Sequence, residues 1–178
     1  MNMKKLRTIF TGLLAIATLS AYAADNAFTL NTNAFHNAGP LPVLYTCDGK
    51  NVSPELDWSN IPPKTQSLAI IMSDPDAPGA MFYHWIVYNI PTSVKAIDET
   101  INQLPTGAVA GKNDFGNMEY NGPCPPKGAA HTYSITLYAL DSKLNLPTGA
   151  NAEQVINAMQ NHILDKVVLT TVYSRWLK

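Results

Sequence analysis

In this 178-residue sequence, residues 131–140 (HTYSITLYAL) alternate clearly: ring or aliphatic side chains stand at the odd-numbered positions, and mostly polar ones stand between them. Successive side chains of a β-strand point to opposite faces, so the alternation predicts a strand with one buried face. His131 and Tyr133 come first on that face, followed by Ile135 and Leu137. The strand is therefore expected to place an imidazole and a phenol side by side at one end of an apolar face.

Further strands are expected along the rest of the sequence. Residues 68–73 (LAIIMS) form an apolar run of strand length, which we expect to be buried on both faces. Residues 81–90 (MFYHWIVYNI) are aromatic and β-branched and end before Pro91, and period two puts His84 on the face of Phe82, Ile86 and Tyr88. Shorter strands are expected at residues 28–32, 41–46, 53–58 and 167–173.

One helix is expected near the C-terminus. Residues 151–165 carry apolar side chains at helical spacing, and Asn151 with Gln154 makes a capping box. Residues 94–121 have little periodicity and are expected to form a long loop, of a length that is usually functional in a compact domain. Because strands predominate and do not alternate with helices, the sequence predicts a mainly β fold, a sandwich of two packed antiparallel sheets with short turns.

The N-terminus has the features of a secretory signal. Residues 1–23 contain three cations, a short apolar run at residues 8–19 and a small-x-small pattern at residues 21–23. We expect cleavage after Ala23 and a single domain at residues 24–178, in the periplasm or secreted. An uncleaved anchor is the alternative, although the apolar run is short for a membrane span. The predicted leader holds three of the 12 basic residues, so nine remain against 13 acidic ones.

Charge and cysteine content exclude some classes of binding partner and suggest a disulfide. A mildly acidic domain offers no basic surface for nucleic acid, and one remaining arginine, Arg175, cannot form a guanidinium cluster for phosphate. Cys47 and Cys124 are the only cysteines, and in an oxidising compartment they are a candidate disulfide. Free or metal-binding thiols are the alternative, but no CxxC spacing indicates a zinc site.

Polar side chains near the ends of the predicted strands are the candidate functional groups. Asp74 and Asp76 follow a buried strand in a turn that Pro75 and Pro78 make rigid. The alternative for these carboxylates is a structural role, since Asp commonly accepts from turn amides. Likewise, His84 inside an aromatic strand is also compatible with a buried structural histidine. A stiff segment, residues 122–128 (GPCPPKG), comes just before His131.

These motifs together resemble the phosphatidylethanolamine-binding protein family, also called the Raf kinase inhibitor protein family. The resemblance spans about residues 28–175 and rests on five ordered blocks. The blocks are SPELDW at residues 53–58, DPDAP at residues 74–78, HW at residues 84–85 leading to NIP at residues 89–91, GPCPPKG at residues 122–128, and HTY at residues 131–133. Residues 111–116 (GKNDFG) and 124–126 (CPP) resemble its bacterial YbhB/YbcL branch.

The resemblance implies a β-sandwich with a small pocket near the sheet edge that binds anions or phospholipid head groups. By motif position, the pocket residues would be Asp74, His84, Pro125, His131 and Tyr133, with Asp76 and Tyr120 close by. Many relatives have arginine where this chain has Thr132, which strand alternation directs away from His131 and Tyr133. Any protein-binding surface that uses that arginine is therefore in doubt.

Without arginine, an anion needs imidazolium, hydroxyl and backbone N–H donors. His84 and His131 would carry charge below a pKa of about 6.5, and a nearby carboxylate would raise that pKa. We expect no cofactor, no metal and no catalysis, because neither an activated nucleophile nor a metal-binding spacing is visible. The alternatives are a protease or kinase inhibitor that acts through its surface and, less favoured, a hydrolase or metal enzyme using these His and Asp residues. Peripheral membrane contact and a dimer remain compatible with the sequence.

Overall fold

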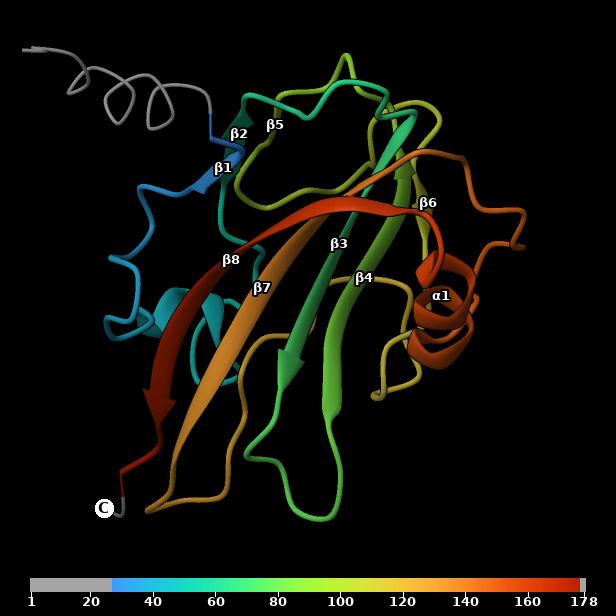
Figure 1. The fold of residues 1–178 in the computed structure, drawn as a ribbon. Coiled ribbons are helices and arrows are strands. Elements are labelled where there is room, and N and C mark those ends of the chain that lie inside the picture. Colours follow the sequence, from blue (N-terminus) through green and yellow to red (C-terminus); the bar gives the residue numbers. More distant parts are fainter. Residues whose placement is uncertain (1–26, 177–178) are drawn as a thin grey trace, which may run out of the picture.

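A computed structural model describes residues 27–176, where strands form two antiparallel sheets (Figure 1). The predicted leader at residues 1–23 lies outside the described residues. The larger sheet has the order β6 (Val109–Ala110), β4 (Phe82–Ile90), β3 (Ser67–Asp74), β7 (Ala130–Leu140) and β8 (Ile163–Ser174). The smaller sheet has the order β1 (Thr29–Asn31), β2 (Leu56–Ser59) and β5 (Ala96–Ile97). The prediction of a mainly β fold with two antiparallel sheets is confirmed.

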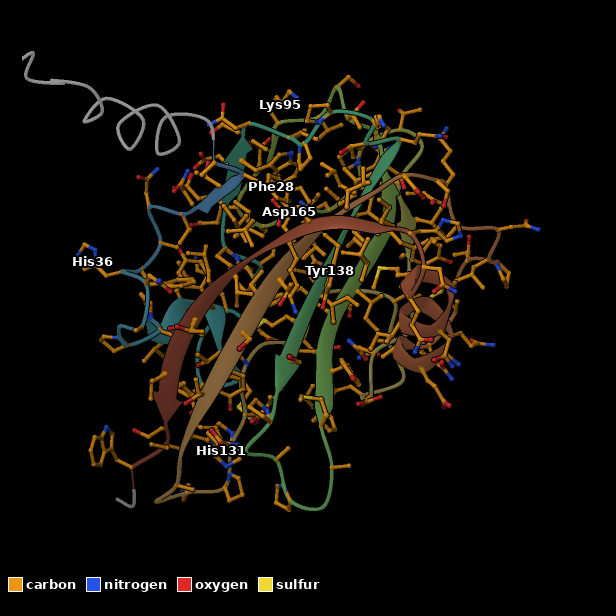
Figure 2. All side chains as sticks on the ribbon, viewed as in Figure 1. Phe28, His36, Lys95, His131, Tyr138 and Asp165 are labelled. Carbon is orange, nitrogen blue, oxygen red and sulfur yellow. A yellow bond between two sulfur atoms is a disulfide. The ribbon has the colours of Figure 1, made fainter. Side chains whose placement is uncertain are left out.

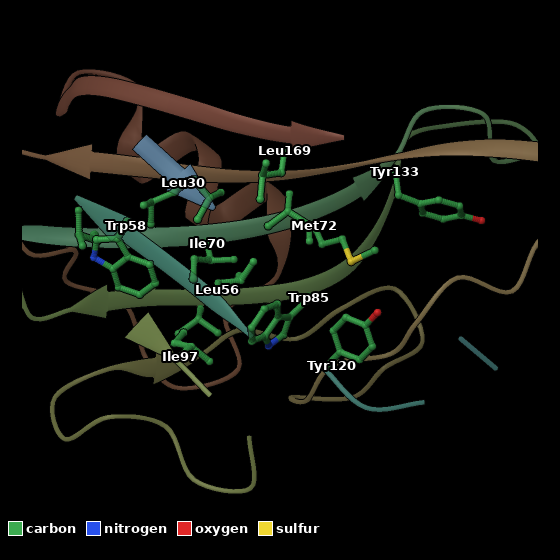
Figure 3. Close-up of a cluster of buried hydrophobic side chains, with 14 of the residues drawn as sticks. Leu30, Leu56, Trp58, Ile70, Met72, Trp85, Ile97, Tyr120, Tyr133 and Leu169 are labelled. Carbon is green, nitrogen blue, oxygen red and sulfur yellow. The ribbon is translucent and has the colours of Figure 1, made fainter. Parts of the chain in front are cut away.

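The main hydrophobic core lies between the two sheets (Figure 3). Leu30, Leu56 and Trp58 of the smaller sheet pack against a cluster that includes Ile70 and Met72 of β3. All five side chains are at least 96% buried. Burial of a large apolar side chain contributes about 1.5–3 kcal/mol, so this cluster is a principal source of stability. It also fixes which face of β3, β4 and β7 points inward.

The opposite face of the larger sheet is covered by α1 (Ala152–Met159), where Val155 and Met159 are buried (Figure 1). The capping box is confirmed, because Asn151 and Gln154 each accept from the backbone N–H of the other. The expected extent of the helix, residues 151–165, is wrong. The chain turns after Met159, and Ile163 begins β8 opposite Leu140, so strand pairing replaces the helix there.

The expected strand at residues 41–46 is also wrong. The chain forms a 3-10 helix, η1 (Val43–Tyr45), in which the backbone and side chain of Thr46 both donate to Val43 O. Pro40 and Pro42 lack the N–H groups that a strand ladder needs, which favours this local turn. Leu41 still donates to Val172 O, and this bond holds the segment beside β8.

The long segment at residues 94–121 is mostly irregular, as expected, but it includes the short strands β5 and β6. Its last part is organised by Asn113, which is 97% buried. The Asn113 amide group donates to three oxygens, and its carbonyl accepts from the N–H groups of Phe115 and Asn117. A buried amide with all of its groups paired specifies one loop shape. None of the helices in the described part of the chain is long and apolar enough to cross a membrane.

Candidate ligand-binding site

A cavity of about 240 Å³ opens where β3 ends and β7 begins. His131 marks this end of the molecule in Figure 2. The cavity is smaller than the roughly 300–1,000 Å³ of pockets for drug-sized molecules, so it suits a small group. The lining residues are Asp74, Ala77, Pro78, Phe82, His84, Phe115, Cys124, Pro125, Pro126 and His131. Four of the seven predicted ligand-binding residues therefore line it, namely Asp74, His84, Pro125 and His131.

Asp74 and His131 form a buried pair on neighbouring strands. The His131 Nδ1 atom lies 2.8 Å from Asp74 Oδ2, and the side chains are only 7% and 5% exposed. A carboxylate can only accept, so Nδ1 carries the proton of this bond in either protonation state of the ring. The remaining ring nitrogen, Nε2, is then the atom through which His131 can contact a ligand.

Asp76 has a supporting position beside this pair and does not line the cavity. Its backbone N–H donates to Asp74 Oδ1 at 2.9 Å, and its carboxylate accepts from the Thr132 N–H at 2.7 Å. The turn after β3 is therefore tied to the start of β7, and this fixes Asp74 opposite His131. A direct ligand contact of Asp76 stays a prediction.

His84 lies at a β-bulge in β4. Met72 of β3 is opposite Trp85, but the next residue, Ser73, is opposite Tyr83, so His84 has no partner in the register. A bulge changes the direction of a side chain by breaking the two-residue alternation. His84 therefore faces the cavity, on the same side as Trp85. The predicted placement of His84 with Ile86 and Tyr88 is wrong, because those two pack on the opposite face with α1.

The bulge is held in place by hydrogen bonds to the loop at residues 111–121. Asn113 Nδ2 and the Asn121 N–H both donate to His84 O. The His84 Nδ1 atom lies 2.8 Å from Asn121 O. A carbonyl oxygen can only accept, so Nδ1 carries a proton and Nε2 is left for a ligand. Both cavity histidines thus have Nδ1 bound to the protein.

Burial lowers the pKa of His84, although its hydrogen bond to Asn121 and the negative charge of Asp74 oppose the shift. The predicted rise in pKa from a nearby carboxylate is therefore wrong for His84, because desolvation is the larger effect. The ring is neutral at pH 7, and its Nε2 is then an acceptor. Because its pKa lies below the usual histidine value of 6.5, His84 gains a charge only at a pH below 6.5.

Tyr133 lies beneath the two histidines and is fully buried. Its ring is stacked near His131 and meets His84 edge-on, with ring centroids 6.3 and 5.3 Å away. Burial first, and then the charge of Asp74, raise the pKa of Tyr133, so its hydroxyl remains a donor. This hydroxyl makes no well-formed hydrogen bond with a described residue, although the Asp74 carboxylate lies near it. A buried hydroxyl without a partner costs about 1–3 kcal/mol, and a ligand oxygen would remove that cost.

Two aromatic residues of the cavity were not predicted as site residues. Phe82 and Phe115 meet edge-on at 4.9 Å, and each also contacts the His84 ring. Phe115 is 45% exposed and belongs to the loop that Asn113 organises. No periodicity marks a residue in an irregular loop, and the only signal was the GKNDFG motif. The cavity thus combines polar atoms at its base with an apolar rim.

Tyr120 is adjacent to the site but directed elsewhere. Its hydroxyl donates to Tyr45 O at 2.7 Å, and its ring packs edge-on against Trp85 in the core (Figure 3). Its contact with a ligand stays a prediction. The disulfide between Cys47 and Cys124 is present.

His162 lies outside the cavity, at the surface of the protein. It lies between α1 and β8, and its Nδ1 atom is 2.7 Å from Asp141 Oδ1. Both of these side chains are 44% exposed. Within residues 27–176, no three His, Cys, Asp or Glu side chains gather in a way that could hold a metal ion.

Comparison with known proteins identifies the family. The model of the phosphatidylethanolamine-binding protein family matches residues 31–174. A UPF0098 protein of Methanothermobacter thermautotrophicus is 45% identical over 149 residues, which are 82% of this chain and 98% of that protein. The UPF0098 protein YbcL of Escherichia coli K12 is 38% identical over 156 residues, which are 81% of this chain and 84% of YbcL.

Solved structures agree with the sequence comparison. The crystal structure of Escherichia coli YbcL, described as a member of the mammalian PEBP family, matches with a TM-score of 0.79 and 34% identity, covering 85% of this chain and 99% of that one. A putative phosphatidylethanolamine-binding protein homologue from Chlamydia trachomatis matches with a TM-score of 0.78 and 37% identity, covering 84% and 99%. With the family model spanning both sheets and the cavity, the chain belongs to the phosphatidylethanolamine-binding protein family.

Proposed function

We propose that this protein is an exported, non-catalytic binding protein that takes a small phosphate-type anion or a phospholipid head group into the cavity. The observation that carries the proposal is the buried Asp74–His131 pair in the cavity lining, with Nδ1 bound to the carboxylate and Nε2 left for a ligand. The family name supports a phospholipid head group as one source of the ligand.

The chemistry of the cavity suits a phosphate group that still carries a proton. Neutral His84 presents Nε2 as an acceptor, and a protonated phosphate oxygen can donate to it. When its ring is protonated, His131 Nε2 can donate to another oxygen. The Tyr133 hydroxyl, which is buried and not part of the lining, can do so only where a ligand oxygen reaches it. Phe82 and Phe115 then face the remainder of the ligand, and their faces can contact an ammonium group.

Catalysis is disfavoured by the composition of the lining. The described residues that line the cavity include no Ser, Thr or Lys, and the one sulfur among them belongs to the disulfide. His131 with Asp74 resembles a base with its orienting group, but covalent catalysis also needs a nucleophile within reach. Export is supported by the disulfide, because such bonds persist in oxidising compartments. An inhibitory role of the surface stays a prediction from the sequence.

The test is a histidine NMR titration of the purified protein with inorganic phosphate and, separately, phosphoethanolamine. We expect the ring signals of His84 and His131 to shift, while His36 and His162 serve as controls in the same molecule. Affinity should rise from pH 7.5 to pH 5.5, because a phosphate group with a second pKa of about 6 gains the proton that neutral His84 can accept. Tighter binding of phosphoethanolamine would favour a head group, and equal binding would favour free phosphate.

Two results would contradict the proposal. The first is a lack of ring shifts at His84 and His131 with both ligands. The second concerns the head group: phosphoethanolamine that binds more tightly than phosphate in the unmodified protein, with an advantage that Phe115→Ala leaves unchanged. This exposed rim residue can be truncated without opening the core.

A further inference from the structure

One wall of the cavity, residues 122–128, is attached to a second segment, residues 45–51. Cys124 and Pro125 of this wall line the cavity. The wall is joined to the second segment by the disulfide to Cys47 and by the Cys47 N–H, which donates to Pro123 O at 3.1 Å. The segments are so close that a Cβ atom on Gly122 would lie 2.0 Å from Tyr45 O.

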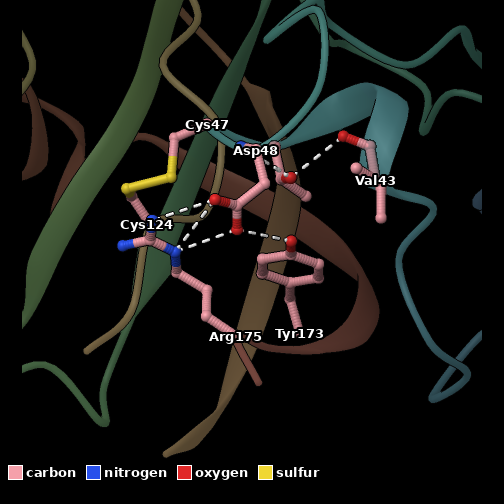
Figure 4. A network of polar contacts seen from close by, with 7 residues as sticks. Val43, Cys47, Asp48, Cys124, Tyr173 and Arg175 are labelled. Atoms are coloured by element: carbon pink, nitrogen blue, oxygen red, sulfur yellow. Dashed lines mark hydrogen bonds and ion pairs between the residues drawn. A yellow bond between two sulfur atoms is a disulfide. The ribbon is translucent and has the colours of Figure 1, made fainter. Parts of the chain in front are cut away.

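Arg175, which directly follows β8, binds the same second segment through Asp48. Its Nε and Nη2 atoms donate to both carboxylate oxygens of Asp48 at 2.9–3.1 Å, and the Tyr173 hydroxyl also donates to Asp48 (Figure 4). A two-pronged Arg–carboxylate contact fixes orientation as well as distance. Asp48 directly follows Cys47, so the contact with Arg175 also restrains Cys47, to which the wall is joined by the disulfide.

Arg175 also binds the wall itself. Its carbonyl oxygen accepts from the Gly128 N–H at 2.7 Å, and Lys127 bridges to it in parallel register. The Arg175 side chain does not line the cavity. It lines a separate groove of about 740 Å³ with Asp48, Lys127 and Tyr173, on the other side of the wall. The wall is therefore tethered twice, through the disulfide at Cys124 and through Arg175 at Gly128.

We infer that Arg175 is a positioning residue for the anion cavity, acting through Asp48 and Gly128 to hold the wall at a fixed distance from His84 and His131. This inference rests on the proposed function. It gives a role to the single arginine outside the predicted leader, whose side chain does not line the cavity. Hydrogen bonds from Arg175 and then Tyr173, with the charge of Lys127, lower the pKa of Asp48, so the carboxylate stays ionised where histidines titrate.

Because the tethers act on the same wall, each one partly compensates for loss of the other. The experiment compares Arg175→Met, a paired Cys47→Ser and Cys124→Ser variant, and the combination of all three changes. Each is titrated with inorganic phosphate at pH 5.5. We expect each tether alone to weaken binding about threefold and the combination to weaken it about 30-fold or more, more than the product of the two.

Two further variants separate positioning from charge. Lys166→Met removes a cation from the exposed part of the same strand and should leave phosphate affinity unchanged. Arg175→Lys keeps the charge but cannot bind both carboxylate oxygens in the same way, so we expect an intermediate affinity. A second readout needs no ligand. The Gly128 N–H donates to the backbone carbonyl of Arg175, which Arg175→Met retains, so this variant tests whether the side-chain contact with Asp48 holds residue 175 in place. If it does, the Gly128 amide should exchange faster with solvent in Arg175→Met than in Lys166→Met.

Unchanged phosphate affinity in the combined variant would overturn the inference. A loss of phosphate affinity in Lys166→Met equal to that in Arg175→Met would also overturn it. If the unmodified protein binds no phosphate or phosphoethanolamine, the proposed function fails separately. The positioning of the wall is then decided by Gly128 exchange and by the ring signals of His84 and His131. If neither changes between the unmodified protein and the combined variant, Arg175 does not position the wall.

Discussion

Two His–Asp pairs lie at opposite ends of β7, about 33 Å apart for a strand of this length. His131 with Asp74 and His162 with Asp141 have nearly equal Nδ1 to carboxylate distances, 2.8 and 2.7 Å. The first pair is 7% and 5% exposed, and the second is 44% exposed on both sides. The same two groups with the same geometry are thus a candidate site at one end and a surface contact at the other. Burial and the surrounding side chains make the difference.

The largest expected effect is on stability when one histidine is removed. His131→Ala leaves a buried carboxylate without its partner, which costs about 3–5 kcal/mol. His162→Ala breaks an exposed pair that water and salt already screen, which costs at most about 1 kcal/mol. Urea unfolding followed by tryptophan fluorescence, which reports on the buried Trp58 and Trp85, measures both. Equal losses in the two variants would remove the distinction between the pairs.

A smaller effect is expected when the carboxylates are replaced by amides. Both oxygens of Asp74 accept, one from His131 and one from the Asp76 N–H. In Asp74→Asn, the amide NH₂ either meets the Asp76 N–H or requires His131 to move its ring proton from Nδ1 to Nε2. Either change carries a cost, and we expect a loss of about 1–3 kcal/mol in unfolding free energy. Asp141→Asn can turn its oxygen to His162 and its NH₂ to solvent, so its loss should be within about 1 kcal/mol. A loss in Asp74→Asn no larger than in Asp141→Asn would contradict this account.

The smallest effect concerns pH and His84. Its pKa is lowered in the folded protein, so the unfolded chain binds more protons below pH 6.5. The contribution to stability is complete above that pH and is lost as the pH falls through the folded-state pKa, by at most about 1.4 kcal/mol for each pH unit. His84→Asn keeps a donor for Asn121 O without titrating.

Urea unfolding at pH 7.5, 6.5 and 5.5 should show a larger decline for the unmodified protein than for His84→Asn. His162→Asn serves as the control, because its side chain is exposed in either state. A decline equal in the unmodified protein and in His84→Asn would show that burial of this ring does not determine the pH dependence.

Regular strands were predictable from the sequence because their packing follows simple alternation. The expected strands at residues 68–73, 81–90 and 131–140 correspond closely to β3, β4 and β7. The expectation of a strand at residues 41–46 overlooked the N–H groups that Pro40 and Pro42 lack. The early end of α1 was missed because contacts between β8 and β7 decide it. These contacts are distant in sequence.

The candidate site was predictable to the extent that it lies on regular strands. Asp74, His131 and Tyr133 follow from strand ends and period two. Phe115 could not be found in this way, because a loop whose shape depends on Asn113 has no period. The role of Arg175 was also beyond the sequence, since nothing near it in the chain indicates Asp48.

The bulge at His84 divides β4 into two parts, and the residue positions that face inward differ between them by one. At Trp85 and Val87 the odd-numbered residues point into the sandwich, whereas at Phe82 and His84 the even-numbered residues face the cavity. A second register shift, before Ile90, returns an even-numbered residue to the core. Loss of one residue here would leave the inward-facing positions of the core part unchanged and turn His84 away from the cavity. We therefore expect one inserted position to decide whether the sheet carries this ligand site, with the packing around Trp85 and Val87 retained.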